Sequence, residues 1–156
     1  MGPGVPKRIL VASDFSPIAQ RALAYARALA RKFDATIVLL HAVPPVLQVE
    51  GIDAAAVARE AEAWARQQAE KIKGEPAKTI IMHGPPVECI VREARKQRVD
   101  LIVLGSRGLS GWKKWLLGSV TERVLQSAPC PVLVVSKSVR IPRQARQTSR
   151  KPVSRS

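Results

Sequence analysis

The feature that most constrains the fold is the segment of residues 101–135, which reads LIVLGSRGLSGWKKWLLGSVTERVLQSAPCPVLVV. It begins with a short unbroken apolar run, typical of a strand that is buried on both faces, and Gly105 ends that run. Apolar residues then recur at helical spacing from Val120 to Ala128, and Pro129 prevents the helix from continuing. The segment therefore predicts a strand, a glycine-containing loop, a helix and a final strand.

The glycines of this loop have a regular spacing. Gly105, Gly108 and Gly118 form the pattern G-x-x-G, nine residues, G-S. Glycine lets backbone amides approach a ligand closely, and the start of a helix adds unpaired N–H donors at the positive end of its dipole. Although each glycine alone is explained by a loop or a helix end, the joint spacing predicts a phosphate site. The pattern differs from the P-loop and from the G-x-G-x-x-G dinucleotide motif.

Together with an early strand that ends in Val11-Ala12-Ser13-Asp14, this pattern resembles the ATP-binding kind of universal stress protein, whose signature is G-x-x-G, nine residues, G-[ST]. The resemblance covers roughly residues 7–136. It implies ATP with Mg²⁺ as the ligand and a homodimer that pairs through the last strand, Val132–Val135. It also implies the strand order 3-2-1-4-5.

The rest of the chain alternates between strand and helix patterns. We expect strands at residues 8–12, 36–41, 78–82, 101–104 and 132–135, with helices between them. Ser16 is the expected N-cap of the first helix, and Val57, Ala61, Trp64, Ala65 and Ile72 mark the expected apolar face of a helix over residues 53–73. This alternation predicts a Rossmann-like α/β fold, with an open five-stranded parallel sheet and helices on both faces. In such sheets ligands bind at the carboxyl ends of the strands beside the switch point, here strands 1 and 4.

Several residues at this switch point are candidate ligand contacts. Asp14 either closes an Asx-turn or, as the resemblance implies, lies by the ribose and the phosphate-bound Mg²⁺. Arg107 is either a solvated loop charge or a phosphate contact. Ser119 either caps its helix or offers its hydroxyl to a phosphate, and Thr121 could add a second hydroxyl. The resemblance also implies that Ala12, Ser13 and Ala42 line the adenine and ribose region near Leu104. The full expected nucleotide site is Ala12, Ser13, Asp14, Ala42, Leu104, Gly105, Arg107, Gly108, Gly118, Ser119, Val120 and Thr121, with Asp14 as the metal ligand.

Composition limits the class of protein. A chain of 156 residues fits one domain, expected at residues 1–136, followed by a basic and disordered tail at residues 137–156. The tail holds seven Lys or Arg and no acid, so the remainder carries 26 − 7 = 19 basic against 12 acidic residues, or +7 of the total +14. We expect weak contact of the tail with polyanions, no membrane span and a cytoplasmic location. Cys89 and Cys130 lack metal or disulfide spacing, so we expect inert thiols, and we expect His41 and His83 to be structural.

The residues and the resemblance together leave two principal functions. The first is a nucleotide-binding protein of the stress response that uses ATP as a ligand or switch, with little or no hydrolysis. The second is a slow ATPase, for which the sequence shows no Walker-B acid or Gln/Arg pairing. Whether the chain is an enzyme therefore stays open. A third class, nucleic-acid binding through the tail, has charge but no base-reading motif.

Overall fold

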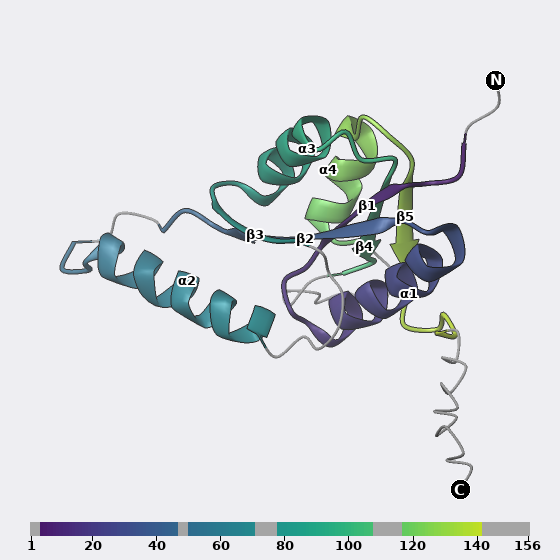
Figure 1. Ribbon diagram of the computed structural model, residues 1–156. Coiled ribbons are helices and arrows are strands. Elements are labelled where there is room, and N and C mark those ends of the chain that lie inside the picture. Colours follow the sequence, from purple (N-terminus) through teal and green to yellow (C-terminus); the bar gives the residue numbers. More distant parts are fainter. Residues whose placement is uncertain (1–3, 47–49, 71–77, 108–116, 142–156) are drawn as a thin grey trace, which may run out of the picture.

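The protein folds around a five-stranded parallel sheet, seen in a computed structural model that describes residues 4–46, 50–70, 78–107 and 117–141 (Figure 1). The strand order is β3-β2-β1-β4-β5, which confirms the predicted topology. The elements in chain order are β1 (Arg8–Ala12), α1 (Pro17–Phe33), β2 (Thr36–Val43), α2 (Ala54–Glu70), β3 (Lys78–His83), α3 (Pro86–Lys96), β4 (Leu101–Gly105), α4 (Ser119–Ser127) and β5 (Val132–Val135).

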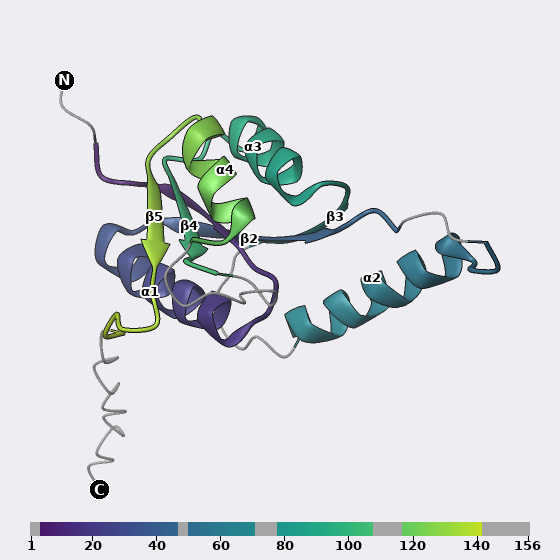
Figure 2. The same cartoon turned by 180° about the vertical axis from the view of Figure 1, so that it is seen from behind.

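Helices cover both faces of this sheet, as expected. Figures 1 and 2 show α1 and α2 on one side and α3 and α4 on the other. Successive strand residues point to opposite faces, so Ile9 and Val11 join the core under α1, while Leu10 joins the core under α3 and α4. Burial of both faces explains why the central strands are continuous apolar runs instead of alternating ones.

Helix α1 forms as its sequence predicts. The Ser16 side chain accepts a hydrogen bond from the Ala19 N–H at 3.2 Å and so caps the helix, with Pro17 in the first turn. Buried small and aliphatic residues recur along one face, and a left-handed Asp34 ends the helix. The cap fixes the start of α1 and therefore limits the turn between β1 and α1 to a few residues.

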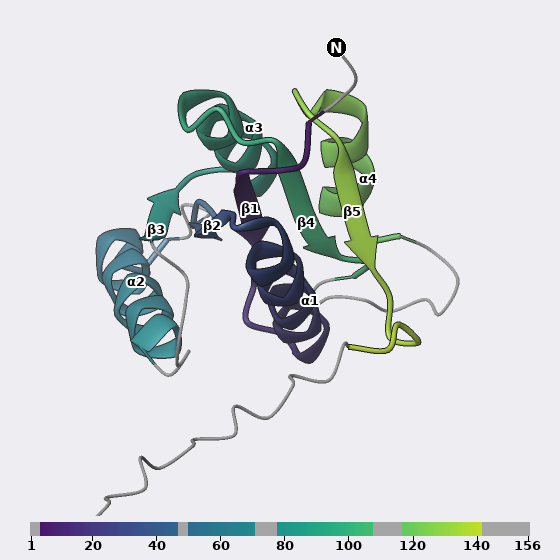
Figure 3. The same cartoon turned by 45° about the vertical axis from the view of Figure 1, so that its right-hand side comes forward.

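Helix α2 departs from expectation. Of the apolar face predicted for it, only Ala65 is buried, whereas Val57 is 39% and Trp64 is 44% exposed; Ile72 lies outside the described residues. The reason is the position of the helix. Figure 3 shows α2 beside the β3 edge of the sheet, where little sheet remains for a wide apolar face to cover. Leu125 of α4, one of the apolar residues that recur at helical spacing between Val120 and Ala128, is likewise 44% exposed.

The two cysteines are free thiols, Cys89 buried and Cys130 partly buried. Burial raises the pKa of both thiols, so they stay protonated near neutral pH and are poor nucleophiles. None of the helices in the described part of the chain has the length and apolar character that crossing a membrane requires.

The packed chain continues beyond β5. Val139 packs against the core under α1, and its carbonyl accepts a hydrogen bond from the Arg21 guanidinium. The packed part of the chain therefore extends three residues past the expected boundary at residue 136. Residues 142–156, which make up most of the expected tail, lie outside the described residues.

Candidate functional site

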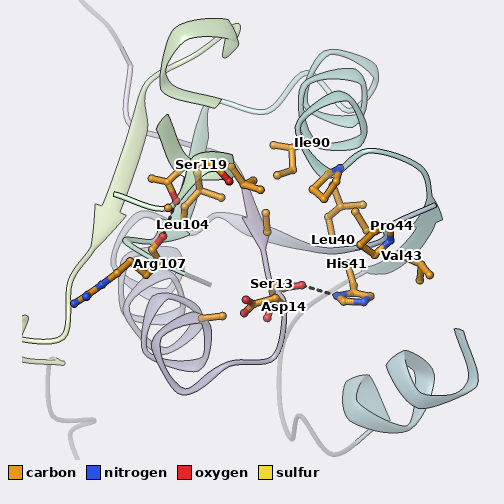
Figure 4. Close-up of a pocket in the computed structure, with 18 of the residues that line it drawn as sticks. Ser13, Asp14, Leu40, His41, Val43, Pro44, Ile90, Leu104, Arg107 and Ser119 are labelled. Carbon is orange, nitrogen blue, oxygen red and sulfur yellow. Dashed lines mark hydrogen bonds between the residues drawn. The ribbon is translucent and has the colours of Figure 1, made fainter. Parts of the chain in front are cut away.

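A cavity of about 440 Å³ opens at the carboxyl ends of the central strands (Figure 4). Every expected ligand residue that the structure describes lines it; Gly108 lies outside the described residues. Those residues are Ala12, Ser13, Asp14, Ala42, Leu104, Gly105, Arg107, Gly118, Ser119, Val120 and Thr121. Segments far apart in the sequence thus meet at the switch point between β1 and β4.

The turn after β1 is held by its own polar groups. The Ser13 N–H donates to the Leu40 carbonyl at 2.9 Å, and the Ser13 carbonyl accepts from His41 Nδ1 at 2.7 Å. Because a carbonyl can only accept, Nδ1 carries a proton and is the donor of this hydrogen bond. The backbone N–H and C=O groups of Ser13 are therefore both hydrogen-bonded to β2.

Asp14 closes the Asx-turn that the sequence predicts as one of its two roles. Its Oδ1 accepts a hydrogen bond from the Ser16 N–H at 3.0 Å, while the residue also lines the cavity. A carboxylate has two oxygens and about four lone-pair sites, so this hydrogen bond does not prevent a second interaction. The geometry is compatible with both roles.

Phe15, between these residues, has the unusual backbone angle φ of 61°. A left-handed conformation is unfavourable for a bulky residue and persists only where the surroundings enforce it. Here the Phe15 N–H donates to Ser13 Oγ at 3.0 Å and the Phe15 carbonyl accepts from Gln20 Nε2 at 3.2 Å. The strain turns the chain sharply from β1 into α1 beside the cavity.

The β4 side of the cavity is tightly packed. A Cβ added to Gly105 would lie 3.0 Å from Ile18 Cγ2 and 3.3 Å from the Ile18 carbonyl carbon, so glycine permits close contact between β4 and α1. Thr121 Oγ1 donates to the Gly105 carbonyl at 3.0 Å. The Thr121 hydroxyl proton is therefore already used within the protein, and this geometry favours a structural role for the side chain.

Gly118, not Ser119, is the N-cap of α4, with no side-chain hydrogen bond at the cap. Its N–H donates to the Ser106 carbonyl at 2.9 Å, which joins the start of the helix to the end of β4. Ser119 is exposed in the first turn and lines the cavity. Of the two roles predicted for Ser119, capping is thus wrong.

The cavity has an apolar and a polar region. Leu40, Ala42, Ile90 and Leu104 supply aliphatic surface, whereas Asp14, Ser119 and the loop after β4 supply polar groups. In Figure 4 the Arg107 side chain extends away from Asp14 and His41. Pockets of this size with apolar walls and a few convergent polar groups are the usual form of small-molecule sites.

Some lining residues were missed by sequence reasoning. His41 was expected to be structural, and Trp64 was expected in the core, yet both line the cavity with Val43, Pro44 and Ile90. His41 follows directly before the expected contact Ala42, which was a usable signal. No sequence signal brings Trp64 here, because it lies on a helix that the chain could have packed in several ways.

Carboxylates are sparse at the site. Asp14 is the single acidic residue among the described residues that line the cavity, and these described segments contain no cluster of three or more His, Cys, Asp or Glu that could hold a metal ion. A divalent cation here would need most of its oxygen ligands from the bound molecule or from water, which is how Mg²⁺ commonly binds with phosphates.

Comparison with known proteins agrees with the fold. The family model described as "Universal stress protein family" matches residues 6–136. The chain is 37% identical over 134 residues to a universal stress protein of Thermus aquaticus, covering 83% of this chain and 98% of that relative.

Solved structures give the same result. A universal stress protein from Lactobacillus plantarum has a TM-score of 0.75 at 28% identity, covering 83% of this chain and 97% of that chain. A universal stress protein in complex with cAMP has a TM-score of 0.58 at 27% identity, covering 85% of this chain and 98% of that one. The chain therefore belongs to the universal stress protein family.

Proposed function

We propose that this protein binds ATP, together with Mg²⁺, as a regulatory ligand in the cavity at the ends of β1 and β4. One observation carries the proposal: the glycines and polar residues after β4 and the Asp14 turn after β1 line the same cavity. The relative described in complex with cAMP supports an adenine nucleotide as the class of ligand.

The separation of the cavity into an apolar and a polar region suggests how the nucleotide would lie. The aliphatic surface of Leu40, Ala42 and Ile90 suits the adenine, and the Ser13 peptide between β1 and β2 suits the ribose. The phosphates would lie against the backbone after Gly105 and the start of α4, where N–H groups and the helix dipole favour anions.

Asp14 would hold the metal together with phosphate oxygens. The carboxylate is a hard oxygen ligand, and its two oxygens offer about four lone-pair sites, more than the hydrogen bond of the Asx-turn uses. The bound ion would neutralise phosphate charge. No other carboxylate lines the cavity in the part of the chain that the structure describes, so we expect the complex to depend strongly on this one residue.

We expect slow turnover or none. Phosphoryl transfer to water needs a group that positions the attacking water and cationic groups that stabilise charge at the γ-phosphate. Among the cavity residues described, Asp14 is the single carboxylate, and the Arg107 side chain extends away from it. The protein would therefore hold the nucleotide more effectively than it would cleave it.

The test is calorimetry on folded protein freed of nucleotide, comparing the natural chain with Gly118→Val. Gly118 has φ −62° and ψ 147°, angles that a side chain tolerates, so this substitution adds bulk without backbone strain or a change of charge. We expect ATP affinity to fall tenfold or more, about 1.4 kcal/mol.

Gly4→Val is the matched control, because nothing lies within 4 Å of a Cβ added there; its ATP affinity should equal that of the natural chain. Absence of measurable ATP, ADP or AMP binding at millimolar ligand would refute the proposal. Turnover well above one per second would make the protein an enzyme.

A further inference from the structure

Three aromatic rings meet beside the apolar region of the cavity. The Phe15 and His41 ring centroids lie 4.8 Å apart, and the Trp64 ring contacts both edge-on, at 5.6 Å from Phe15 and 6.1 Å from His41. We call these three residues the aromatic cluster. They come from three different elements: the turn after β1, β2 and α2.

The three rings differ sharply in exposure. Phe15 is 9% and His41 8% exposed, whereas Trp64 is 44% exposed although it contacts both. His41 and Trp64 also line the cavity. The Trp64 ring therefore presents open aromatic surface at the cavity, and a ligand bound there would cover it.

The two buried rings are fixed in place. His41 Nδ1 donates to the Ser13 carbonyl, and the Phe15 backbone is held by hydrogen bonds on both sides. Trp64 rests edge-on against this rigid support. A ring held in this way loses little conformational entropy on meeting a ligand.

Helix α2 itself is held against the sheet by few groups near Trp64. Ala65 is its one buried residue, and Glu62 Oε2 pairs with His83 Nε2 of β3 at 2.8 Å. Glu62 and Ala65, on either side of Trp64 in the sequence, thus fix the helix, and one turn before Trp64, Ala61 also lines the cavity. The wall that α2 contributes to the cavity is consequently Ala61 and Trp64.

We propose that Trp64 is a ligand-binding residue whose ring stacks on the base of the bound nucleotide. The inference rests on the proposed function, and it assigns α2 a role in base recognition. Aromatic side chains stack on nucleobases with useful strength, and every base presents a π-face. The aliphatic residues opposite contribute burial, but only Trp64 offers exposed aromatic surface among the cavity residues described.

The experiment measures ATP affinity by calorimetry for Trp64→Ala, Trp64→Leu and Trp64→Phe. We expect a loss of tenfold or more for Trp64→Ala, and a similar loss for Trp64→Leu, which keeps apolar bulk but has no π-system. Trp64→Phe should stay within about threefold of the natural chain. Because Trp64 is partly exposed, none of these substitutions should unfold the protein, which circular dichroism checks.

Val57→Ala is the matched control, since Val57 is an exposed apolar residue of the same helix at 39% and does not line the cavity; its affinity should be unchanged. Equal affinity for Trp64→Ala and the natural chain would overturn the inference. Full rescue by Trp64→Leu would also overturn it, because the ring would then only hold the wall. Failure of the natural chain to bind ATP would instead refute the proposed function.

Discussion

Asp14 combines two tasks in the proposed site, and its hydrogen bond allows them to be separated. Oδ1 accepts from the Ser16 N–H, which stabilises the turn before α1, while the negative charge is the part that would bind Mg²⁺. Asparagine retains the acceptor oxygen and removes the charge. Alanine removes both.

We therefore predict that Asp14→Asn keeps the stability of the natural chain but binds Mg·ATP at least tenfold more weakly, with little change for metal-free ATP. Asp14→Ala should in addition lose about 1 kcal/mol of stability, a typical value for one hydrogen bond. Calorimetry with and without Mg²⁺ and urea denaturation measure the two effects. Equal weakening of both forms of ATP by Asp14→Asn would mean that the carboxylate holds the ribose.

Gly105 is restricted by close packing and not by an unusual backbone angle. A Cβ there would approach the backbone of α1, which cannot move as a flexible side chain can. We predict that Gly105→Ala destabilises the protein by about 1–3 kcal/mol, the usual cost of overpacking. Urea denaturation checks this, with Gly4→Ala as a control because the space around Gly4 is open; a stable Gly105→Ala variant would contradict it.

At the scale of elements, Glu62 links α2 to β3. The hydrogen bond from His83, followed by that from Arg66, lowers the pKa of the Glu62 carboxyl below its usual value of 4.5. A lowered pKa in the folded state means that the hydrogen bonds to the Glu62 carboxylate stabilise the fold above pH 4.5. That contribution is lost as the pH falls through the lowered pKa.

We predict that the Glu62 side-chain carboxyl, followed by NMR, titrates with a midpoint below 4.5. In His83→Ala this midpoint should rise toward the usual value, because the largest cause is removed. In Arg66→Ala it should rise less, since Arg66 is the smaller cause. An unchanged midpoint in His83→Ala would show that the hydrogen bond between His83 and Glu62 is not formed in solution.

Elements differ in how well the sequence predicts them. The strands and α1 were predicted closely because continuous apolar runs, a capped helix start and Pro17 are local signals. Strand β2 is two residues longer than predicted and strand β3 is one residue longer. The two strands pair with each other over these additional residues, which keeps the backbone extended. The apolar face of α2 was wrong because its burial depends on how much sheet lies beneath it, which no local pattern encodes.

For the site as well, local signals predict positions and contacts between distant segments do not. Residues directly after β1 and β4 could be placed together because the carboxyl ends of parallel strands share one edge. Trp64 could not, since its contact with Phe15 and His41 joins three distant segments. Capping by Gly118 instead of Ser119 is a shift of one residue, within the normal uncertainty of helix ends.

At the scale of the whole molecule, β5 is an edge strand. The Pro131 carbonyl accepts from Ile102 of β4 and the Val135 carbonyl from Ser106 directly after it. The N–H and C=O of the alternating residues Val132 and Val134 therefore face outward. Unpaired edges of this kind favour pairing with another strand. The expected homodimer through Val132–Val135 remains a proposal that this geometry makes testable.

We predict that Val134→Pro produces a folded monomer. Proline removes an outward N–H but no hydrogen bond to β4, and edge strands tolerate it for that reason. Light scattering at tens of micromolar should show a dimer for the natural chain and a monomer for the variant. A natural chain that is monomeric at this concentration would contradict the proposal.

The basic tail can be tested without disturbing the core. Residues 142–156 carry five Lys or Arg, and removing them leaves the contact of Arg21 with Val139 intact. We predict that this truncation abolishes salt-sensitive binding to DNA or acidic vesicles, because that binding depends on cationic charge. ATP affinity should stay unchanged; a parallel loss of both would place the tail in the pocket.

The contact between Arg21 and Val139 has a practical consequence for work with this protein. It holds the chain after β5 against α1 at the edge where the cavity opens, whereas β1 enters the sheet from the opposite edge (Figure 1). A purification tag, surface linker or fluorescent fusion attached directly after Ile141 would start its path at the edge of the sheet where the cavity opens. The amino terminus is therefore the better point of attachment for immobilised binding assays.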